Sequence, residues 1–569
     1  MTDTADLPPP GAPDIDIARA ATLRPIAALA RERLGLEADD LVPYGHHIAK
    51  LSPDAVQAAS ARPAGRLVLV TAVSPTPAGE GKTTTSVGLN DGLNRLGVKS
   101  IVCLREPSLG PVFGMKGGAA GGGRAQVLPM EQINLHFTGD LHAISAAHAL
   151  VSAMLDNHLH WGNALDIDPN RISWRRAVDM NDRALRDVVV GMGGNGVVRE
   201  DGFDITVASE IMAVFCLATD LTDLQKRIGD MVVGETRGTA KTRKPVTVRD
   251  LGADGAVTVL LRDAFSPNLV QSVENNPALI HGGPFANIAH GCNSVVATRT
   301  ALGLADVVVT EAGFGADLGA EKFLNIKCRQ TGLRPDACVL VATVRSMRFQ
   351  GGAKVDALNR PDADAVARGV VNLSRHIQNM KAFGLTPVVA LNAFASDTQA
   401  EVDILREAAR AEGARLVLAN HWAEGGAGAE DLARAVMAAL DGPAPDIRLL
   451  YREKDSLADK VRSVATIIYR ADDVVFLPAA RAARRQIGRM GYGHLPVCIA
   501  KTQSSFSTDP KARGAASGHT LEVRDVVLNA GAGFVVMVCG DILRMPGLPR
   551  RPAALDIRLD GEGRITGLS

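Results

Sequence analysis

The sequence has few aromatic residues and no excess of charge of either sign. Phe, Trp and Tyr make up 4% of its 569 residues, and 62 Lys and Arg balance 62 Asp and Glu. A balanced charge gives no net field that would attract nucleic acid or an anionic membrane surface, so neither is expected as a partner. The scarcity of aromatic residues gives weight to any that directly follow a predicted strand.

The sequence also lacks the usual signals of a disulfide framework, a zinc cluster or a membrane helix. The seven cysteines include no CxxC pair, which is typical of reduced, buried thiols. No apolar run approaches the roughly 18 residues of a membrane helix. The first ten residues have neither the basic nor the apolar region of a signal peptide. We therefore expect a cytoplasmic protein.

Apolar runs of strand length alternate with helical stretches almost throughout. This alternation predicts an α/β fold with largely parallel sheets. Strands are expected at 66–73, 100–104, 186–190, 205–208, 257–261, 306–310, 387–391 and 415–418. Helices are expected at 83–96, 141–155, 363–383 and 398–412.

Length and composition indicate several domains. The prior for a chain of this length is roughly three or four units. A polar, proline-bearing stretch at 358–364 and a second break at 441–445 interrupt the pattern, and a glycine-punctuated region begins near Gly491. We predict a large N-terminal domain at 1–360, a second α/β domain at 361–490 and a smaller C-terminal domain at 491–569.

The most informative segment is 67–85, where a buried strand leads into a glycine-bearing loop, Gly-Lys-Thr and a helix start. It follows the pattern G-x-x-x-x-G-K-[ST], except that a threonine replaces the first glycine. Backbone N–H groups of such a loop bind phosphates. The pattern predicts a P-loop NTPase-like core that binds a nucleoside triphosphate through Thr76, Pro77, Ala78, Gly79, Glu80, Gly81, Lys82 and Thr83. Lys82 would reach the outer phosphates, and the Thr83 hydroxyl would bind Mg²⁺.

Arg105 directly follows the predicted strand at 100–104. A right-handed β-α-β crossover makes this strand parallel to the one before the loop, so Arg105 is expected at the same sheet edge as the phosphates. Its guanidinium suits a planar carboxylate or a phosphoryl group. The glycine-rich run at 114–124 lets the backbone approach a ligand closely, so we expect it to form a wall of this site.

Matching segments now identify a family resemblance. The chain resembles formate–tetrahydrofolate ligases (formyltetrahydrofolate synthetases) nearly from end to end. The segments that carry the resemblance are 76–85, 104–111, 114–123, 134–140, 310–323, 341–345, 384–394, 500–503 and 545–549. The chain departs from the usual family pattern at Arg124, at 346–350 and at Ser504.

The resemblance implies a reaction and its cofactors. ATP would convert formate to formyl phosphate, and the N10 amine of tetrahydrofolate would attack the formyl carbon to give 10-formyltetrahydrofolate, ADP and phosphate. Such chemistry needs phosphate positioning and charge neutralisation more than a covalent nucleophile. By resemblance, Arg105 holds formate and then formyl phosphate, Glu106 helps to bind a monovalent cation (K⁺ or NH₄⁺), and the protein is a homotetramer. A structural ion pair is the alternative for Glu106.

Proton transfer and Mg²⁺ binding have further candidates. The attacking amine must release a proton, and Asp140 is the first candidate to accept it. Its alternative is an N-cap of the helix expected at 141–155. Glu311 and Asp317 flank a glycine turn after the strand at 306–310 and are candidate carboxylates near Mg²⁺.

Two aromatic residues follow successive predicted strands. Phe394 comes after the strand at 387–391, and Trp422 comes after the strand at 415–418. Both are expected at one edge of a parallel sheet, where they would sandwich a pterin by offset stacking. The family uses the matching aromatics in this way.

Two other functions remain open. An NTP-driven molecular switch would use the same loop but would have no use for the two aromatics. A different ATP-dependent carboxylate ligase, such as one acting on a diamino acid, would keep the core and form no folate product.

Overall fold

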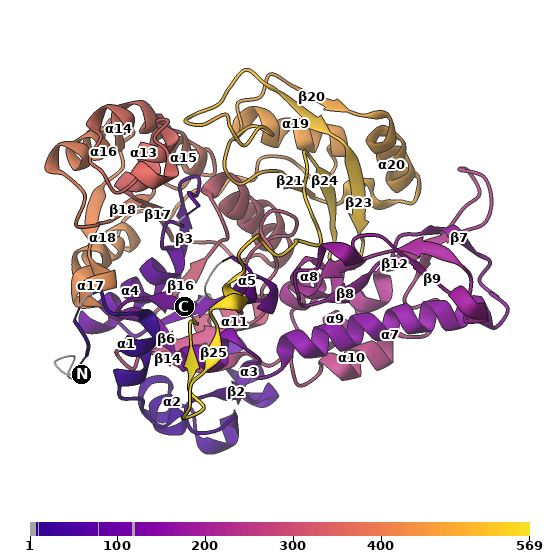
Figure 1. The fold of residues 1–569 in the computed structure, drawn as a ribbon, viewed down its shortest axis with the longest axis horizontal. Coiled ribbons are helices and arrows are strands. Elements are labelled where there is room, and N and C mark those ends of the chain that lie inside the picture. Colours follow the sequence, from indigo (N-terminus) through magenta and orange to yellow (C-terminus); the bar gives the residue numbers. More distant parts are fainter. Residues whose placement is uncertain (1–6, 10, 78, 116–119, 569) are drawn as a thin grey trace.

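The computed structural model describes residues 7–9, 11–77, 79–115 and 120–568. One large sheet forms its centre (Figure 1). In spatial order its main strands are β1 (Leu41–Pro43), β2 (Ala49–Leu51), β14 (Asn268–Ser272), β15 (Pro277–Ile280), β4 (Ser100–Leu104), β16 (Val307–Glu311), β3 (Arg66–Ala72), β17 (Ala337–Ala342), β18 (Val388–Asn392) and β19 (Leu416–Ala419). Two further strands branch from this path: β6 (Ala125–Leu128) pairs with β14, and β5 (Gly121–Gly122) pairs with β6. From β15 to β19 all neighbouring strands are parallel. The predicted α/β class with a largely parallel main sheet is therefore confirmed.

Alternation along the strands divides the core into two layers. Leu67 and Leu69 of β3 pack on one face of the sheet, whereas Val68 and Val70 pack on the other. The strands are buried on both faces, which is why they read as nearly continuous apolar runs. The first face is covered by α2 (Ile26–Leu34), α3 (Pro53–Ser60), α11 (Val295–Leu304), α15 (Val371–Ala382) and α16 (Gln399–Ala411). The second is covered by α4 (Lys82–Arg95), α6 (Met130–Asn134) and α18 (Glu430–Leu440).

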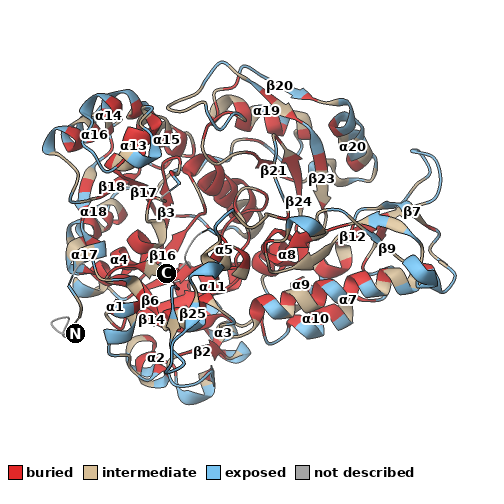
Figure 2. Ribbon diagram, in the orientation of Figure 1, coloured by how far each residue is buried: buried red, intermediate tan, exposed pale blue. Residues whose placement is uncertain are grey.

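A helical arm, residues 140–261, extends from the sheet at the lower right of Figure 1. Its helices are α7 (Asp140–His160), α8 (Glu210–Leu217), α9 (Leu221–Asp230) and α10 (Asp254–Leu261). Its strands are β7 (Ile167–Ile172), β8 (Arg176–Val178), β9 (Val188–Val190), β10 (Arg199–Asp201), β11 (Phe203–Ile205), β12 (Val232–Thr236) and β13 (Pro245–Thr247). In Figure 2, α8 is buried, while α7 and α10 expose one side to solvent.

The C-terminal unit, residues 457–538, lies above the arm in Figure 1. It comprises α19 (Leu457–Ile467), β20 (Asp473–Phe476), α20 (Pro478–Arg489), β21 (Val497–Ala500), β22 (Thr520–Val523), β23 (Asp525–Asn529) and β24 (Phe534–Val538). A short hairpin, β25 (Arg558–Leu559) and β26 (Ile565–Thr566), follows it. The seven cysteines are all buried and free, as their spacing predicted. Within the described ranges, no helix has the length and apolar content needed to cross a membrane.

Several predicted elements need correction. The expected strand at 257–261 is part of helix α10, and the one at 205–208 is mainly a 3-10 turn, Thr206–Ala208. Short apolar runs do not distinguish a strand from a buried helix, and here both segments pack inside the arm. The expected helix at 363–383 is two helices, α14 (Ala363–Gly369) and α15. β9 pairs only with β10, outside the parallel sheet.

Candidate active site

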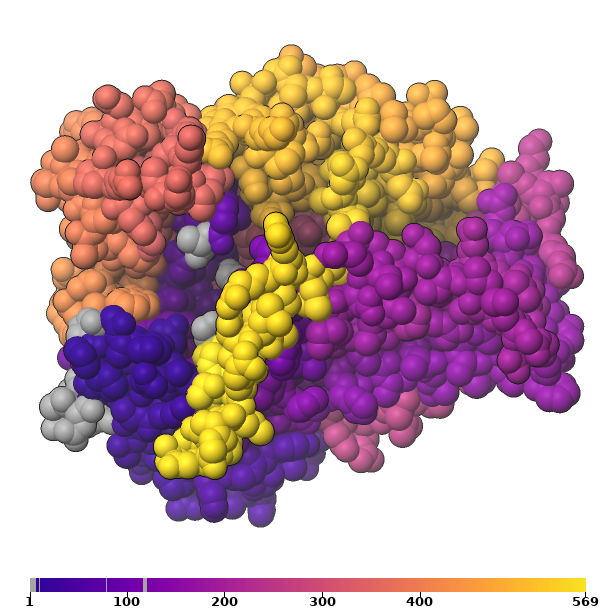
Figure 3. All heavy atoms as spheres, in the orientation of Figure 1, coloured from indigo at the N-terminus to yellow at the C-terminus, as the bar shows by residue number. Residues whose placement is uncertain are grey.

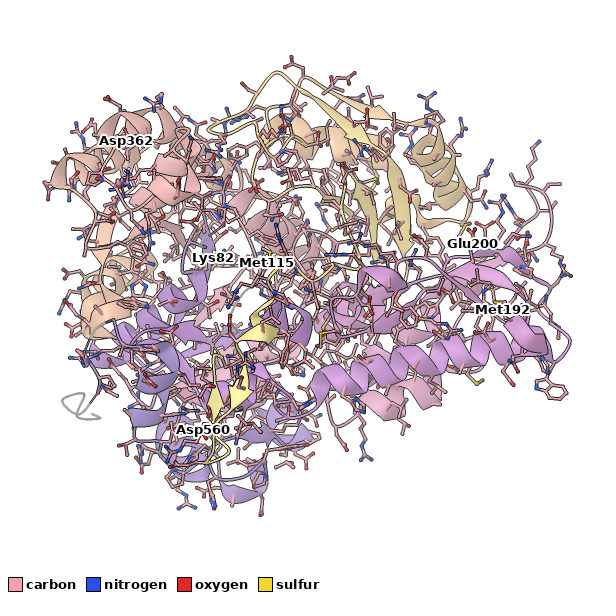
Figure 4. All side chains as sticks on the ribbon, viewed as in Figure 1. Lys82, Met115, Met192, Glu200, Asp362 and Asp560 are labelled. Atoms are coloured by element: carbon pink, nitrogen blue, oxygen red, sulfur yellow. The ribbon has the colours of Figure 1, made fainter. Side chains whose placement is uncertain are left out.

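The loop at 76–83 connects β3 to α4, in the strand–loop–helix order that the sequence predicted. Gly79 and Gly81 adopt positive φ of 78° and 73°, and Ala78 lies outside the described residues. Helix α4 begins at Lys82, and its N-cap Gly81 supplies no side chain to the first-turn amides. Such a helix start is suited to an anion. Figure 3 shows a hollow in the surface, bordered by the helices from α13 (Val344–Gln350) to α16, by the C-terminal unit and by the C-terminal hairpin. Lys82, labelled in Figure 4, lies at the position of this hollow in the same view.

The buried side chain of Glu80 connects this loop to the segment around Thr343 through two hydrogen bonds. Its side chain is buried, and Oε1 accepts a hydrogen bond from the Thr76 backbone N–H at 2.8 Å. Oε2 accepts a second one from the Thr343 hydroxyl at 2.6 Å. Because both carboxylate oxygens accept hydrogen bonds within the protein, the Glu80 side chain is placed to shape the loop.

Thr83, Glu311 and Arg105 meet at the edge where three parallel strands end. The Thr83 hydroxyl donates to Glu311 Oε2 at 2.9 Å, and Arg105 Nε lies 3.3 Å from Glu311 Oε1. Glu311 is the last residue of β16, which lies between β3 and β4. The structure thus brings Arg105 to the same edge as the loop, as the crossover argument predicted. The other candidate carboxylate, Asp317, instead forms a buried ion pair with Lys501 at 2.8 Å.

Asp140 and Glu106 belong to a second, more deeply buried cluster. Lys50 Nζ lies 2.8 Å from Asp140 Oδ1, and Asn268 Nδ2 donates to Asp140 Oδ2 at 2.7 Å. Asp140 is the first residue of α7, whose N-cap is Gly139. The alternative interpretation of Asp140 as the N-cap is therefore wrong.

Glu106 has one oxygen, Oε2, with no hydrogen-bond partner among the described residues. Burial, together with the nearby carboxylates of Asp140 and Asp179, raises the pKa of Glu106 well above its ordinary value, although Lys50 acts in the opposite direction. Such an oxygen is a reasonable ligand for a small cation or a proton. Lys50 was not predicted, because a lysine in the short segment 49–51 carries no sequence signal for this cluster.

Phe394 and Trp422 follow neighbouring parallel strands, β18 and β19, as predicted. The Phe394 ring is half-buried, and the Arg345 guanidinium stacks over it with Cζ 3.3 Å from the ring centroid. Trp422 is 37% exposed and lies in α17 (His421–Glu424). Sequence reasoning did not assign Arg345 a role, because its contact joins segments that are 49 residues apart.

The end of the glycine-rich run packs against Trp422. A Cβ on Gly123, whose φ is 57°, would lie 2.1 Å from the Trp422 carbonyl oxygen, so only glycine fits there. The Arg124 backbone N–H donates to the same carbonyl at 2.9 Å. The departure from the family pattern at Arg124 therefore lies beside the candidate pterin slot. Residues 116–119 of the run lie outside the described residues.

A cavity of about 550 Å³ lies elsewhere, between the helical arm and the C-terminal unit. Its lining includes Trp174, Glu210 and Arg544, and it contains none of the predicted site residues. The candidate site is thus defined by converging side chains at the sheet edge rather than by this cavity.

Comparison with known proteins identifies the family of the chain. The family model described as formate–tetrahydrofolate ligase matches residues 12–569. The chain belongs to the formate–tetrahydrofolate ligase family. It is 61% identical over 557 residues to the formate–tetrahydrofolate ligase of Paracoccus denitrificans, covering 98% of this chain and 99% of that one. The corresponding enzyme of a Methylobacterium species is 60% identical over 559 residues, covering 98% and 99%. That of Granulibacter bethesdensis is 59% identical over 557 residues, covering 98% and 97%.

Membership of this family confirms the resemblance identified from the sequence and makes the protein an enzyme. A solved structure, folylpolyglutamate synthase from Thermotoga maritima, is 12% identical over 68% of this chain and 90% of that chain, with a TM-score of 0.15. That score supports no statement about fold.

Proposed function

We propose that the protein catalyses ATP-dependent ligation of formate to tetrahydrofolate, giving 10-formyltetrahydrofolate, ADP and phosphate. Family membership supports the overall reaction. The observation that best supports the chemical route is that the Thr83 hydroxyl and the Arg105 guanidinium both contact the Glu311 carboxylate, at the sheet edge beside the loop at 76–83.

In the first step, a formate oxygen attacks the γ-phosphorus of ATP and ADP leaves. The product is formyl phosphate, a mixed anhydride with a good leaving group. Lys82 and the N-terminus of α4 hold the phosphates, and Arg105 balances the charge of formate and of the transferring phosphoryl group. The Thr83 hydroxyl and the Glu311 carboxylate are oxygen donors of the kind Mg²⁺ prefers, which fits a Mg²⁺ bound with ATP.

In the second step, the N10 amine attacks the formyl carbon, phosphate leaves and the amine loses a proton. Phe394 and Trp422 hold the pterin ring between them. We assign proton acceptance to the Glu106–Lys50–Asp140 cluster, with Asp140 as the acceptor. The unpartnered oxygen of Glu106 is the proposed ligand of a K⁺ or NH₄⁺ ion.

The route is tested with formate labelled with ¹⁸O. One formate oxygen becomes bonded to phosphorus in formyl phosphate and leaves with phosphate when the amine attacks. Labelled phosphate, formed in step with 10-formyltetrahydrofolate, is the expected result. Product formation with unlabelled phosphate would exclude formyl phosphate as the intermediate.

We further propose that the enzyme is a cytoplasmic homotetramer, as the family resemblance implies. Light scattering of the purified protein tests the assembly, with a mass of four chains expected. A monomer that turns over at the full rate would contradict it.

A further inference from the structure

The residues just before the two candidate pterin aromatics both touch the loop at 76–83 or the helix that follows it. His421 precedes Trp422, and its Nε2 lies 3.1 Å from the Thr85 hydroxyl in the first turn of α4. Asn392 lies two residues before Phe394, and its amide nitrogen donates to the Glu80 carbonyl oxygen at 3.5 Å. Both aromatics are thus connected to the loop through a buried polar neighbour.

The direction of the His421 hydrogen bond follows from the donors available. The Thr85 hydroxyl donates its single hydrogen to the Gly81 carbonyl oxygen at 2.9 Å. It must therefore accept from His421, whose Nε2 carries the hydrogen. Burial lowers the pKa of His421 to about 4, so the ring is neutral near pH 7. Two consecutive hydrogen bonds thus connect His421 to the Thr85 hydroxyl and the Thr85 hydroxyl to the Gly81 carbonyl oxygen.

Packing leaves little freedom for this contact to shift. A Cβ on Gly88 of α4 would lie 2.5 Å from the His421 Cβ and 2.8 Å from its Cγ. The imidazole therefore rests directly on the helix backbone, and its exposed fraction is 0%. Trp422 is the next residue, so it directly follows a side chain that packs on the helix beginning at Lys82.

We propose that His421 is a positioning residue that couples the loop at 76–83 to Trp422, so that nucleotide and folate strengthen each other's binding. The inference rests on the proposed function, because it takes these two sites as the ATP and pterin sites. A nucleotide that orders the loop fixes the Gly81 carbonyl and the first turn of α4. Thr85 and His421 then hold Trp422 in its stacking position. Linkage requires folate to favour nucleotide binding by the same factor.

The variants are chosen to remove or keep the donor at one position. His421→Leu removes the N–H, whereas His421→Gln places an amide N–H near the position of Nε2. Thr85→Val removes the hydroxyl that receives it, with almost no change of shape. His148→Leu is the matched control, because His148 is also buried and also has a pKa lowered to about 4, but it lies in the helical arm, where its ring stacks on Trp174.

The experiment measures MgADP binding by calorimetry, without and with saturating tetrahydrofolate under anaerobic conditions. In the wild type, folate is expected to lower the Kd of MgADP by about 5- to 100-fold, the usual range of coupling between sites. His421→Leu and Thr85→Val should each reduce this factor below about twofold, and the double variant should reduce it no further. His421→Gln and His148→Leu should keep it, although His148→Leu lowers the melting temperature.

The outcomes separate the two proposals. If either ligand fails to bind the wild type, the proposed function fails and this inference fails with it. If both bind but the coupling factor is near one, or is unchanged in His421→Leu and Thr85→Val, the positioning role is wrong and the proposed function stands. Should His421→Leu fail to fold, the nearly isosteric Thr85→Val decides the question alone.

Discussion

Glu311 accepts a hydrogen bond from Thr83 on one carboxylate oxygen, at 2.9 Å, and faces the Arg105 guanidinium with the other, at 3.3 Å. One buried carboxylate thus joins the loop at 76–83 to the candidate formate-binding arginine. Only the parallel order of β3, β16 and β4 makes this possible, since all three strands end at the same edge.

Glu311→Gln keeps the shape of this side chain and removes its charge. We expect kcat/KM to fall by about 10- to 100-fold, because hydrogen bonds to charged groups contribute about 1.5–3 kcal/mol. The Mg²⁺ concentration needed for half-maximal ADP release should rise in parallel. Steady-state assays across a Mg²⁺ series check both effects. Unchanged turnover with an unchanged Mg²⁺ requirement would remove Glu311 from the site.

Arg105→Ser should damage the use of formate far more than the binding of nucleotide. Loss of a charge-assisted hydrogen bond predicts a rise of about 10- to 100-fold in the KM for formate. The Kd of MgADP, measured by calorimetry, should change by less than about threefold. Equal losses of formate use and ADP binding would instead indicate that Arg105 has a structural role through its contact with Glu311.

Trp422→Ala should raise the KM for tetrahydrofolate by at least about fivefold, since a stacked aromatic pair is worth about 1 kcal/mol beyond its buried area. The KM for ATP serves as the internal reference. Trp161→Ala is the control, because Trp161 is 77% exposed at the end of α7, in the helical arm. A folate KM that stays at the wild-type value in Trp422→Ala would contradict the pterin slot.

Glu210→Gln should flatten the dependence of stability on pH. Burial raises the pKa of Glu210 to about 8, even though its Oε1 accepts a hydrogen bond from the Gly531 backbone N–H at 2.8 Å. The folded state therefore holds a proton that the unfolded state releases near pH 4.5. Its contribution to stability is present below that pH and declines as the pH rises to about 8.

Between these limits the wild type should lose up to about 1.4 kcal/mol per pH unit relative to Glu210→Gln. Urea unfolding at pH 5 and pH 8 measures the difference. Glu200→Gln, at an exposed position in the arm, is the control and should follow the wild type. Parallel pH profiles for wild type and Glu210→Gln would show that Glu210 is ionised in the folded protein at pH 5.

The central sheet and the position of Arg105 could be predicted from the sequence, because both depend on local signals. Long apolar runs indicate strands buried on two faces, and a crossover between parallel strands fixes which ends meet. The prediction of a strand at 257–261 was wrong, since five residues are too few to show a helical period. The sheet also continues across residue 360 through β18 and β19. The division into three domains remains a prediction.

The contacts that join the site could not be predicted, because they are made between distant segments. Lys50 and Asp140 are 90 residues apart, and Thr85 and His421 are 336 residues apart. Nothing in the local pattern around His421 indicates that its ring rests on α4. Trp422, the aromatic residue beside it, could be predicted because aromatics are scarce, because this one follows a strand and because the family resemblance implied its role.

The most direct test of the central claim is an end-point assay of the purified protein with ATP, Mg²⁺, K⁺, formate and tetrahydrofolate. Acidification converts 10-formyltetrahydrofolate to methenyltetrahydrofolate, which is read by its absorbance. We expect product only when all three substrates are present, with one ADP per product, and none from Lys82→Ala with an unchanged melting temperature. ATP hydrolysis without formyl transfer, or full activity in Lys82→Ala, would contradict the account.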